Sequence, residues 1–258
     1  MADKNGKPHT PLLKHGIYLL PNLLTSAALF AGFYAIVQAM NANFDAAAIA
    51  IFIAMVMDSL DGRVARLTNT QSAFGAQYDS LSDMVSFGVA PALVLYVWAL
   101  KPLHKLGWIA AFVYCACVAL RLARFNTQHS EDDDKYHFRG LPSPAAAALL
   151  AGFVWVAQEY GLNGQTTLLG VFHMKWVAWC MTVFASTSMV NDLRYYSGKS
   201  INLKDSVPFV VILGVVLVLV LISYSPPEVL FLVAVLYALS GYVHLIRQKY
   251  RRWKSKVA

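Results

Sequence analysis

A long stretch without charge near the N-terminus restricts what this chain can fold into. Residues 17–44 contain no Asp, Glu, Lys or Arg. About 20 apolar residues in a helix are enough to cross the hydrocarbon core of a bilayer. Comparable apolar runs recur along the whole chain, and only 14% of its 258 residues are charged, against about 25% in soluble domains. The sequence therefore predicts an all-α integral membrane protein.

About eight transmembrane helices are expected, which places both termini on one side. Most prolines fall near the expected helix ends, but Pro91 lies inside the third segment and predicts a kink or a local break. We divide the chain into an N-terminal segment (1–17, a candidate interfacial helix), a transmembrane catalytic domain (18–247) and a basic tail (248–258). The expected helices run over about 18–40, 44–65, 73–100, 106–127, 142–160, 170–191, 206–224 and 227–247.

The distribution of basic residues predicts the orientation of these helices. All lysines and arginines except Lys101, Lys105 and Lys175 lie at the termini or in connections on one side. Cationic connections stay cytoplasmic, so both termini are expected on the cytoplasmic face of the cell or inner membrane. The net charge of +7 suits contact with anionic lipid headgroups. No nucleic-acid-binding motif is visible, so we expect no nucleic-acid partner.

Four aspartates mark the candidate site, at the cytoplasmic ends of the second and third helices. Asp58 and Asp61 are three residues apart, and Asp79 and Asp83 are four apart, so each pair lies on one helical face. A short turn joins the two helices, which allows the pairs to meet. Because converging carboxylates repel one another, we expect a hard cation such as Mg²⁺ or Mn²⁺ between them. Helix capping, or pairing with neighbouring arginines, is the alternative for any single aspartate.

Small and polar residues surround these aspartates. Gly62, Ala65 and Gly75 allow either close approach of a substrate to the backbone or tight helix packing. One helical face of the third segment is small and polar, as the lining of a cavity would be. Its members at helical spacing are Ala76, Asp79, Asp83, Ser86 and Ala90.

The chain resembles the CDP-alcohol phosphatidyltransferase family. Every fixed position of the signature Asp-x2-Asp-Gly-x2-Ala-Arg-x8-Gly-x3-Asp-x3-Asp is filled between residues 58 and 83. The flanking stretches 21–25, 121–126 and 138–145 are similar to the phosphatidylserine synthase branch. The resemblance implies transfer of a phosphatidyl group from CDP-diacylglycerol to L-serine with release of CMP. It also implies a homodimer that works among membrane lipids without an organic cofactor.

The resemblance also suggests residue roles. Asp58, Asp61 and Asp79 would hold a divalent metal on the pyrophosphate, and Asp83 would share a second metal or act as the catalytic base. The expected CDP-diacylglycerol-binding residues are Asn22, Thr25, Gly62, Ala65, Arg66 and Gly75. For the serine carboxylate we consider Arg121, Arg124 and Arg139, with Asn126 and Ser143 as further candidates. Each arginine has the alternative of serving membrane orientation alone.

Two alternatives remain open at this point. The acceptor could instead be glycerol 3-phosphate, an inositol phosphate or choline, which differ from serine in charge. The protein could also be a cation-coupled transporter, with the aspartates as its ion site. Transporter sites usually lie near the membrane midplane, whereas these aspartates are expected at one edge, beside basic residues suited to phosphate.

Overall fold

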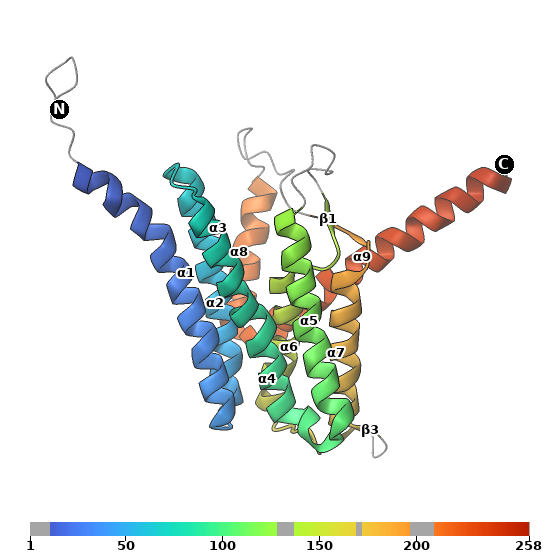
Figure 1. Ribbon diagram of the computed structural model, residues 1–258. Coiled ribbons are helices and arrows are strands. Elements are labelled where there is room, and N and C mark those ends of the chain that lie inside the picture. The colour runs from blue at the N-terminus through green and yellow to red at the C-terminus, as the bar shows by residue number, and fades with distance from the viewer. Residues whose placement is uncertain (1–10, 128–136, 169–171, 197–208, 258) are drawn as a thin grey trace, which may run out of the picture.

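The computed structural model describes residues 11–127, 137–168, 172–196 and 209–257. Figure 1 shows a bundle in which most helices run side by side, while α9 crosses the bundle obliquely and extends beyond it. The elements are α1 (Pro11–Met40), α2 (Phe44–Leu67), α3 (Ala73–Asp83), η1 (Met84–Val89), α4 (Ala90–Leu95), η2 (Tyr96–Leu100), η3 (Lys101–Leu103), α5 (Lys105–Thr127), β1 (His137–Arg139), α6 (Ser143–Glu159), β2 (Thr167–Leu168), β3 (Phe172–His173), α7 (Met174–Val190), β4 (Arg194–Tyr196), α8 (Phe209–Tyr224) and α9 (Pro226–Val257).

Helices occupy each of the eight apolar ranges expected from the sequence. In the described residues, strand structure is confined to two short antiparallel pairs, β1 with β4 and β2 with β3. Four segments are long and apolar enough to cross a membrane, namely Leu19–Met40, Ala73–Leu103, Lys105–Thr127 and Pro226–Arg247. Helices α6, α7 and α8 are shorter, with 16 or 17 residues, and α2 contains several charges. The chain is therefore a helical membrane protein, while the count of eight spans and the side of the termini stay predictions.

Helices α1 and α2 pack against each other along small side chains. Ala35 and Ala39 on α1, and Ala47 and Ala54 on α2, are all at most 1% exposed. Small residues let two helix backbones approach closely, which provides the packing that holds helices together in lipid. Gly32 allows an equally close approach of α1 to η1, because a Cβ at this position would lie 2.5 Å from Ser86 Oγ.

The kink predicted at Pro91 takes the form of a change in helix type. Proline removes the N–H that would bond to the carbonyl oxygen of Phe87. The Tyr114 hydroxyl on α5 donates to that oxygen instead, at 3.0 Å. Just before the proline, the Ala90 N–H bonds to the carbonyl of Val85, which is the wider spacing of a π-helix. The segment from 73 to 103 is thus continuous, but its side-chain register changes along its length.

A second proline differs from expectation. Pro21 is near the expected start of the first helix at about residue 18, but it lies inside α1, which begins at Pro11. The interfacial segment expected over 1–17 is therefore helical from residue 11 onward, and residues 1–10 lie outside the described residues. Helix α9 likewise continues through most of the basic tail expected over 248–258.

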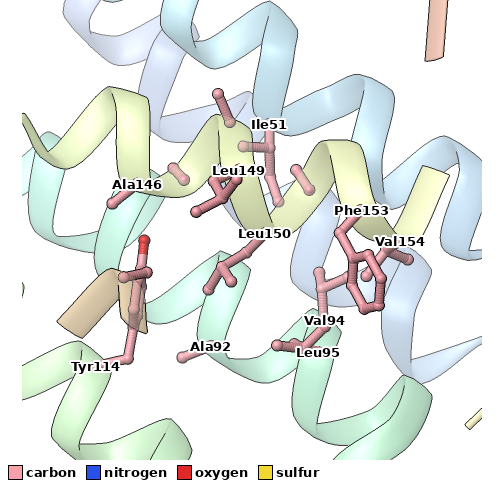
Figure 2. Close-up of a cluster of buried hydrophobic side chains, with 14 of the residues drawn as sticks. Ile51, Ala92, Val94, Leu95, Tyr114, Ala146, Leu149, Leu150, Phe153 and Val154 are labelled. Carbon is pink, nitrogen blue, oxygen red and sulfur yellow. The ribbon is translucent and has the colours of Figure 1, made fainter. Parts of the chain in front are cut away.

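The apolar core is formed where α6 packs against α2 and α4. Figure 2 shows Leu149 and Leu150 of α6 among the side chains of Ile51 and Leu95. All four are at most 1% exposed. In a bilayer, close packing of such side chains stabilises the bundle through van der Waals contacts rather than through transfer from water. This core supports the α2 and α3 ends that carry the candidate site.

One end of the bundle gathers the elements of the candidate site. The C-terminal ends of α2 and α5 and the N-terminal end of α3 lie at the end marked by β1 in Figure 1. Strand β1, which precedes α6, pairs here with β4, which follows α7. Next to this pair, the Gly140 N–H bonds to the carbonyl of Leu193 at 2.8 Å. Gly140 has a φ of +77°, and a Cβ there would lie 2.2 Å from the carbonyl oxygen of Met189. Only glycine fits this turn, which leads directly into α6.

Candidate active site

The reversal between α2 and α3 places the two aspartate pairs opposite each other. Ser72 caps α3, with its hydroxyl accepting the Gly75 N–H at 2.9 Å. At the end of α2 the Thr68 and Thr70 hydroxyls are hydrogen-bonded at 2.7 Å. Asn69 between them has a φ of 52°, a left-handed conformation that asparagine tolerates better than most residues. These local bonds define a tight, antiparallel turn.

The structure brings the four aspartates together. Asp58, Asp61 and Asp79 each offer a carboxylate oxygen, and these oxygens all lie within 4.8 Å of one another. The carboxyl groups of Asp58 and Asp83 are in hydrogen-bonding contact. Such an arrangement of ionised carboxylates is stable only if a proton or a cation lies among them.

The donor set fits a divalent cation. Asp61 is 5% exposed, and Asp79 Oδ1 is buried with no hydrogen-bond partner among the described residues. A buried carboxylate oxygen without a donor is costly, and a metal ion would satisfy it. All of the converging ligands are oxygens, which suits Mg²⁺ or Mn²⁺ rather than a softer metal. The cluster is therefore a site that could bind a divalent metal.

Helix α1 contributes to the cluster through Thr25. This residue is 4% exposed, and its hydroxyl donates to Asp61 Oδ2 at 2.6 Å. Asn22, one turn earlier, lies beside Gly75, since a Cβ on that glycine would be 3.5 Å from Asn22 Oδ1. Two of the expected nucleotide-binding residues thus face the α2–α3 turn.

The remaining expected nucleotide-binding residues lie on the last turns of α2. The Arg66 guanidinium lies over Gly62, because a Cβ there would be 3.7 Å from Arg66 Nη1. Arg66 is exposed, and Ala65 is half-buried with its carbonyl accepting the Thr70 N–H. A glycine below an exposed guanidinium leaves room for a phosphate to approach both the arginine and the backbone.

Arg121 lies apart from the other two candidate arginines. It interacts electrostatically with Asp83, and its Nη1 donates to Ser143 Oγ at 3.0 Å. Its Nε is buried and has no hydrogen-bond partner among the described residues. Ser143 is the first residue of α6 and is 1% exposed. A buried guanidinium with an unused donor, beside a helix N-terminus, is suited to a carboxylate.

Arg124 and Arg139 are directed toward a different acid. Arg124 Nη2 forms an ion pair with Asp192 Oδ1 at 2.8 Å. The hydrogen bond from Arg124 lowers the pKa of Asp192 below its ordinary value, and the charge of Arg139 adds to this. Both arginines thus neutralise an exposed carboxylate in the α7–β4 connection. Only Arg121, of the three arginines expected near serine, interacts with the aspartate cluster.

The cavity-lining face expected on the third helix is wrong beyond Asp83. Ser86 and Ala90 are fully buried, and the Ser86 hydroxyl donates to the carbonyl of Ala28 at 3.1 Å. Ala76, at the other end of this face, is exposed. The cause is the π-helical segment η1, which begins at Met84 and changes the angle between successive residues.

Sequence reasoning missed a polar contact between α3 and α1. Tyr78 is hydrogen-bonded to Ser26 at 2.8 Å, and Ser82 donates to the carbonyl of Thr25 at 3.1 Å. The sequence does contain a signal for this contact, because Tyr78 and Ser82 are four residues apart and therefore share one face of α3. A further bond joins Asn126, a candidate for serine binding, to Ser80 at 2.9 Å. These bonds hold α1 and α5 against the helix that carries Asp79 and Asp83.

Comparisons with known proteins identify relatives of this chain. Residues 18–187 match the family model described as CDP-alcohol phosphatidyltransferase. A Helicobacter pylori protein named CDP-diacylglycerol–serine O-phosphatidyltransferase is 35% identical over 233 residues, covering 89% of this chain and 92% of the relative. A Methanocaldococcus jannaschii protein of the same name is 35% identical over 199 residues, 76% of this chain and 83% of the relative.

A Mycobacterium tuberculosis protein with that name is 39% identical over 165 residues, covering 62% of this chain and 57% of the relative. The family match includes the whole α2–α3 turn and extends through α6 into α7. The four converging aspartates lie within the matched region. The chain belongs to the CDP-alcohol phosphatidyltransferase family.

Proposed function

We propose that this protein transfers the phosphatidyl group of CDP-diacylglycerol to L-serine and so produces phosphatidylserine and CMP. The observation that carries the reaction type is the convergence of Asp58, Asp61 and Asp79, with carboxylate oxygens within 4.8 Å of one another. The choice of serine is supported by relatives named CDP-diacylglycerol–serine O-phosphatidyltransferase, two of which align over most of this chain.

The aspartate cluster would hold Mg²⁺ or Mn²⁺. In this assignment Asp58, Asp61 and Asp79 provide the ligands, and Asp83 is close enough to Asp58 to share a second ion. The bound cation would neutralise pyrophosphate charge and make CMP a better leaving group. Thr25 orients Asp61 by donating to one of its oxygens.

The nucleotide half of the lipid substrate would bind around the α2–α3 turn. Arg66 is free to form charge-assisted hydrogen bonds with phosphate oxygens, since it is exposed and lies over Gly62. Ala65 and Gly75 present little side chain to the ligand. Asn22, beside Gly75, and Thr25 complete the set that we assign to CDP-diacylglycerol.

Asp83 and Arg121 would act on serine. We assign the serine carboxylate to Arg121, because its buried Nε lacks a partner among the described residues and Arg124 is occupied by Asp192. The carboxylate of Asp83 then accepts the proton of the serine hydroxyl. The hydroxyl oxygen forms a bond to the phosphorus that carries the diacylglycerol, and the bond from that phosphorus to the CMP oxygen breaks.

The same proposal includes an arrangement in the membrane. The transmembrane catalytic domain covers 18–247, and the segments 1–17 and 248–258 lie in the cytoplasm with the active site. Support comes from the basic connections at the end of the bundle that carries the aspartates. A cytoplasmic site at the membrane edge suits one lipid substrate and one water-soluble substrate. We further propose a homodimer, as in many members of the family.

A transfer assay with separate acceptors tests the reaction. Purified protein in detergent receives CDP-diacylglycerol, Mn²⁺ or Mg²⁺, and one radiolabelled acceptor: serine, glycerol 3-phosphate or inositol. Label is expected in lipid only from serine, and a chelator should abolish the transfer until metal is restored. Label from another acceptor alone would show that the acceptor is misassigned. No transfer to any acceptor would argue for a cation-coupled transporter instead, and a cation-uptake assay in proteoliposomes would then test that alternative.

A further inference from the structure

A cavity lies at the opposite end of the bundle from the aspartate cluster. Its volume is about 490 Å³, and it lies between the η2–η3 segment, the start of α5 and the loop that follows α6. In Figure 1 this is the end where α5 begins and β3 is labelled. The proposed transfer reaction makes no use of this cavity, so its features need a separate explanation.

The charge of this cavity is positive. Lys101 and His104 line it, together with Asn163 and Gln165, and no acidic residue is among its lining residues. Within the described parts of the chain, Lys101 forms no ion pair. It is one of only three basic residues expected on this side of the membrane. An ammonium group placed here without a counter-charge favours an anionic ligand.

Trp98 adds a hydrogen-bond donor that the described residues leave unused. Its side chain lines the cavity and is only 6% exposed. Its indole Nε1 is buried and has no hydrogen-bond partner in the described structure. A buried donor without an acceptor costs about 1–3 kcal/mol, and a ligand with an acceptor oxygen would recover this energy.

The cavity adjoins the N-terminus of α5 through a single residue, His104. His104, which lines the cavity, immediately precedes this helix of 23 residues. The first helical hydrogen bond runs from the Trp108 N–H to the carbonyl of His104 at 3.3 Å. The N–H groups of the three residues between them have no acceptor within the helix. They present partial positive charge, which binds phosphate and other anions at many helix N-termini.

The surroundings indicate that the anion belongs to a lipid. The cavity lies where two apolar segments meet, Ala73–Leu103 and Lys105–Thr127, each long enough to cross a membrane. Val97 and Pro102 give it an apolar side. Trp108 and Trp176, at the same end, are 52% and 42% exposed, as is common for tryptophans at the membrane–water interface. A free anion would need none of these apolar features.

We propose that this cavity binds the phosphate group of an anionic phospholipid in the leaflet opposite the active site. Lys101 supplies the counter-charge, and the indole N–H of Trp98 and the N-terminus of α5 supply hydrogen bonds. The lipid would bridge the η2–η3 segment and α5, which are consecutive in the chain and antiparallel in the bundle.

Lipid titrations of the purified full-length protein in detergent test the proposal. The probes are phosphatidylglycerol, phosphatidylcholine and inorganic phosphate, and the readouts are the thermal unfolding midpoint and the lipids retained in native mass spectrometry. Phosphatidylglycerol should raise the midpoint in a saturable manner. Trp98→Phe, which keeps an aromatic ring but removes the N–H, and Lys101→Ala should each weaken binding about tenfold. Lys175→Ala removes a charge at the same end outside the cavity and should change binding less than about twofold.

Three outcomes would overturn the proposal. Equal stabilisation by phosphatidylcholine would show that charge is not recognised, and an equal effect of inorganic phosphate would show a free-anion site. Unchanged binding by both Trp98→Phe and Lys101→Ala would show that the lipid binds elsewhere. All variants should keep their phosphatidyl-transfer activity, because the aspartate cluster lies at the other end. This activity also verifies that Trp98→Phe is folded.

Discussion

The Thr25 hydroxyl donates a 2.6 Å hydrogen bond to Asp61 Oδ2. Because Asp61 is among the carboxylates that converge, α1 is coupled to the proposed metal site although it carries no acidic residue itself. Thr25→Val keeps the shape of the side chain but removes this donor. Loss of a hydrogen bond to a charged group costs about 1.5–3 kcal/mol, so we expect kcat/KM for phosphatidyl transfer to fall at least about tenfold.

Thr25→Ser is the matched control for this prediction. It retains the hydroxyl, and we expect it to keep most of the transfer activity. Both variants should be compared at several Mn²⁺ concentrations, since a misoriented Asp61 should raise the metal concentration needed for half-maximal rate. Equal activity of the valine and serine variants would mean that the hydrogen bond does not matter for the site.

Asp83→Asn separates the proposed base from the metal ligands. The amide is nearly the same size as the carboxylate but cannot accept the serine proton, so kcat should fall about 100-fold or more. Binding of CDP-diacylglycerol, followed by isothermal titration, should remain. Asp61→Asn is the comparison, and it should lose activity together with metal-dependent lipid binding. A near-normal kcat for Asp83→Asn would remove Asp83 from its role as base.

Gly32→Ala tests the close crossing of α1 and η1. The new Cβ would lie 2.5 Å from Ser86 Oγ and 2.7 Å from its Cα, and backbone cannot move away as a flexible side chain can. We expect a loss of stability of about 1–3 kcal/mol, typical of overpacking. Gly214→Ala is the control, because a Cβ there meets no atom within 4 Å. Thermal unfolding in detergent should show a lower midpoint for Gly32→Ala only, and equal midpoints would contradict the close contact.

The Arg124–Asp192 ion pair predicts a pH dependence of stability. Arg124 lowers the pKa of Asp192 in the folded protein, so the unfolded chain binds this proton more readily. The stabilisation is fully present above the unfolded pKa of about 3.9 and is lost as the pH falls through the lower folded value. Asp192→Asn should therefore lower stability at neutral pH, by about 0.2–1 kcal/mol for such an exposed pair.

Salt provides the control for that prediction. Added NaCl screens exposed charges, so the difference in unfolding midpoint between the wild-type protein and Asp192→Asn should shrink at 1 M salt. It should also shrink as the pH is lowered below about 4. A difference that is independent of both salt and pH would show that Asp192 acts through packing or neutral hydrogen bonds.

Much of the site was predictable from local spacing. Asp58 and Asp61, and then Asp79 and Asp83, are spaced to share helical faces, and the turn between them is short, so the sequence predicts their convergence. The same rule failed for Ser86, because a π-helical segment begins directly after Asp83 and alters the spacing. Pro91 marks a break in this helix but not the residue at which the π-helical segment begins, and the freed carbonyl of Phe87 is bonded by Tyr114 from another helix.

The arginines show a different limit of sequence reasoning. Arg121 and Arg124 are three residues apart and lie near one face of α5, so spacing treats them as equivalent. Their partners come from distant parts of the chain: Ser143 follows a connection, and Asp192 lies beyond α7. The β1–β4 pairing that joins these connections is too short to leave a strand pattern in the sequence. Tertiary contacts alone distinguish the arginine that interacts with Asp83.

The hydrogen bond from Tyr114 to the carbonyl of Phe87 fixes the position of two antiparallel helices relative to each other. Phe87 is one turn beyond Asp83, and Tyr114 is two turns before Arg121. This hydrogen bond therefore joins the same two helices that carry the proposed base, Asp83, and the proposed partner of the serine carboxylate, Arg121. If either helix slid along its axis, the bond would break and leave a buried oxygen without a donor. A single tyrosine two turns before Arg121 therefore helps to fix the axial position of Asp83 relative to that arginine.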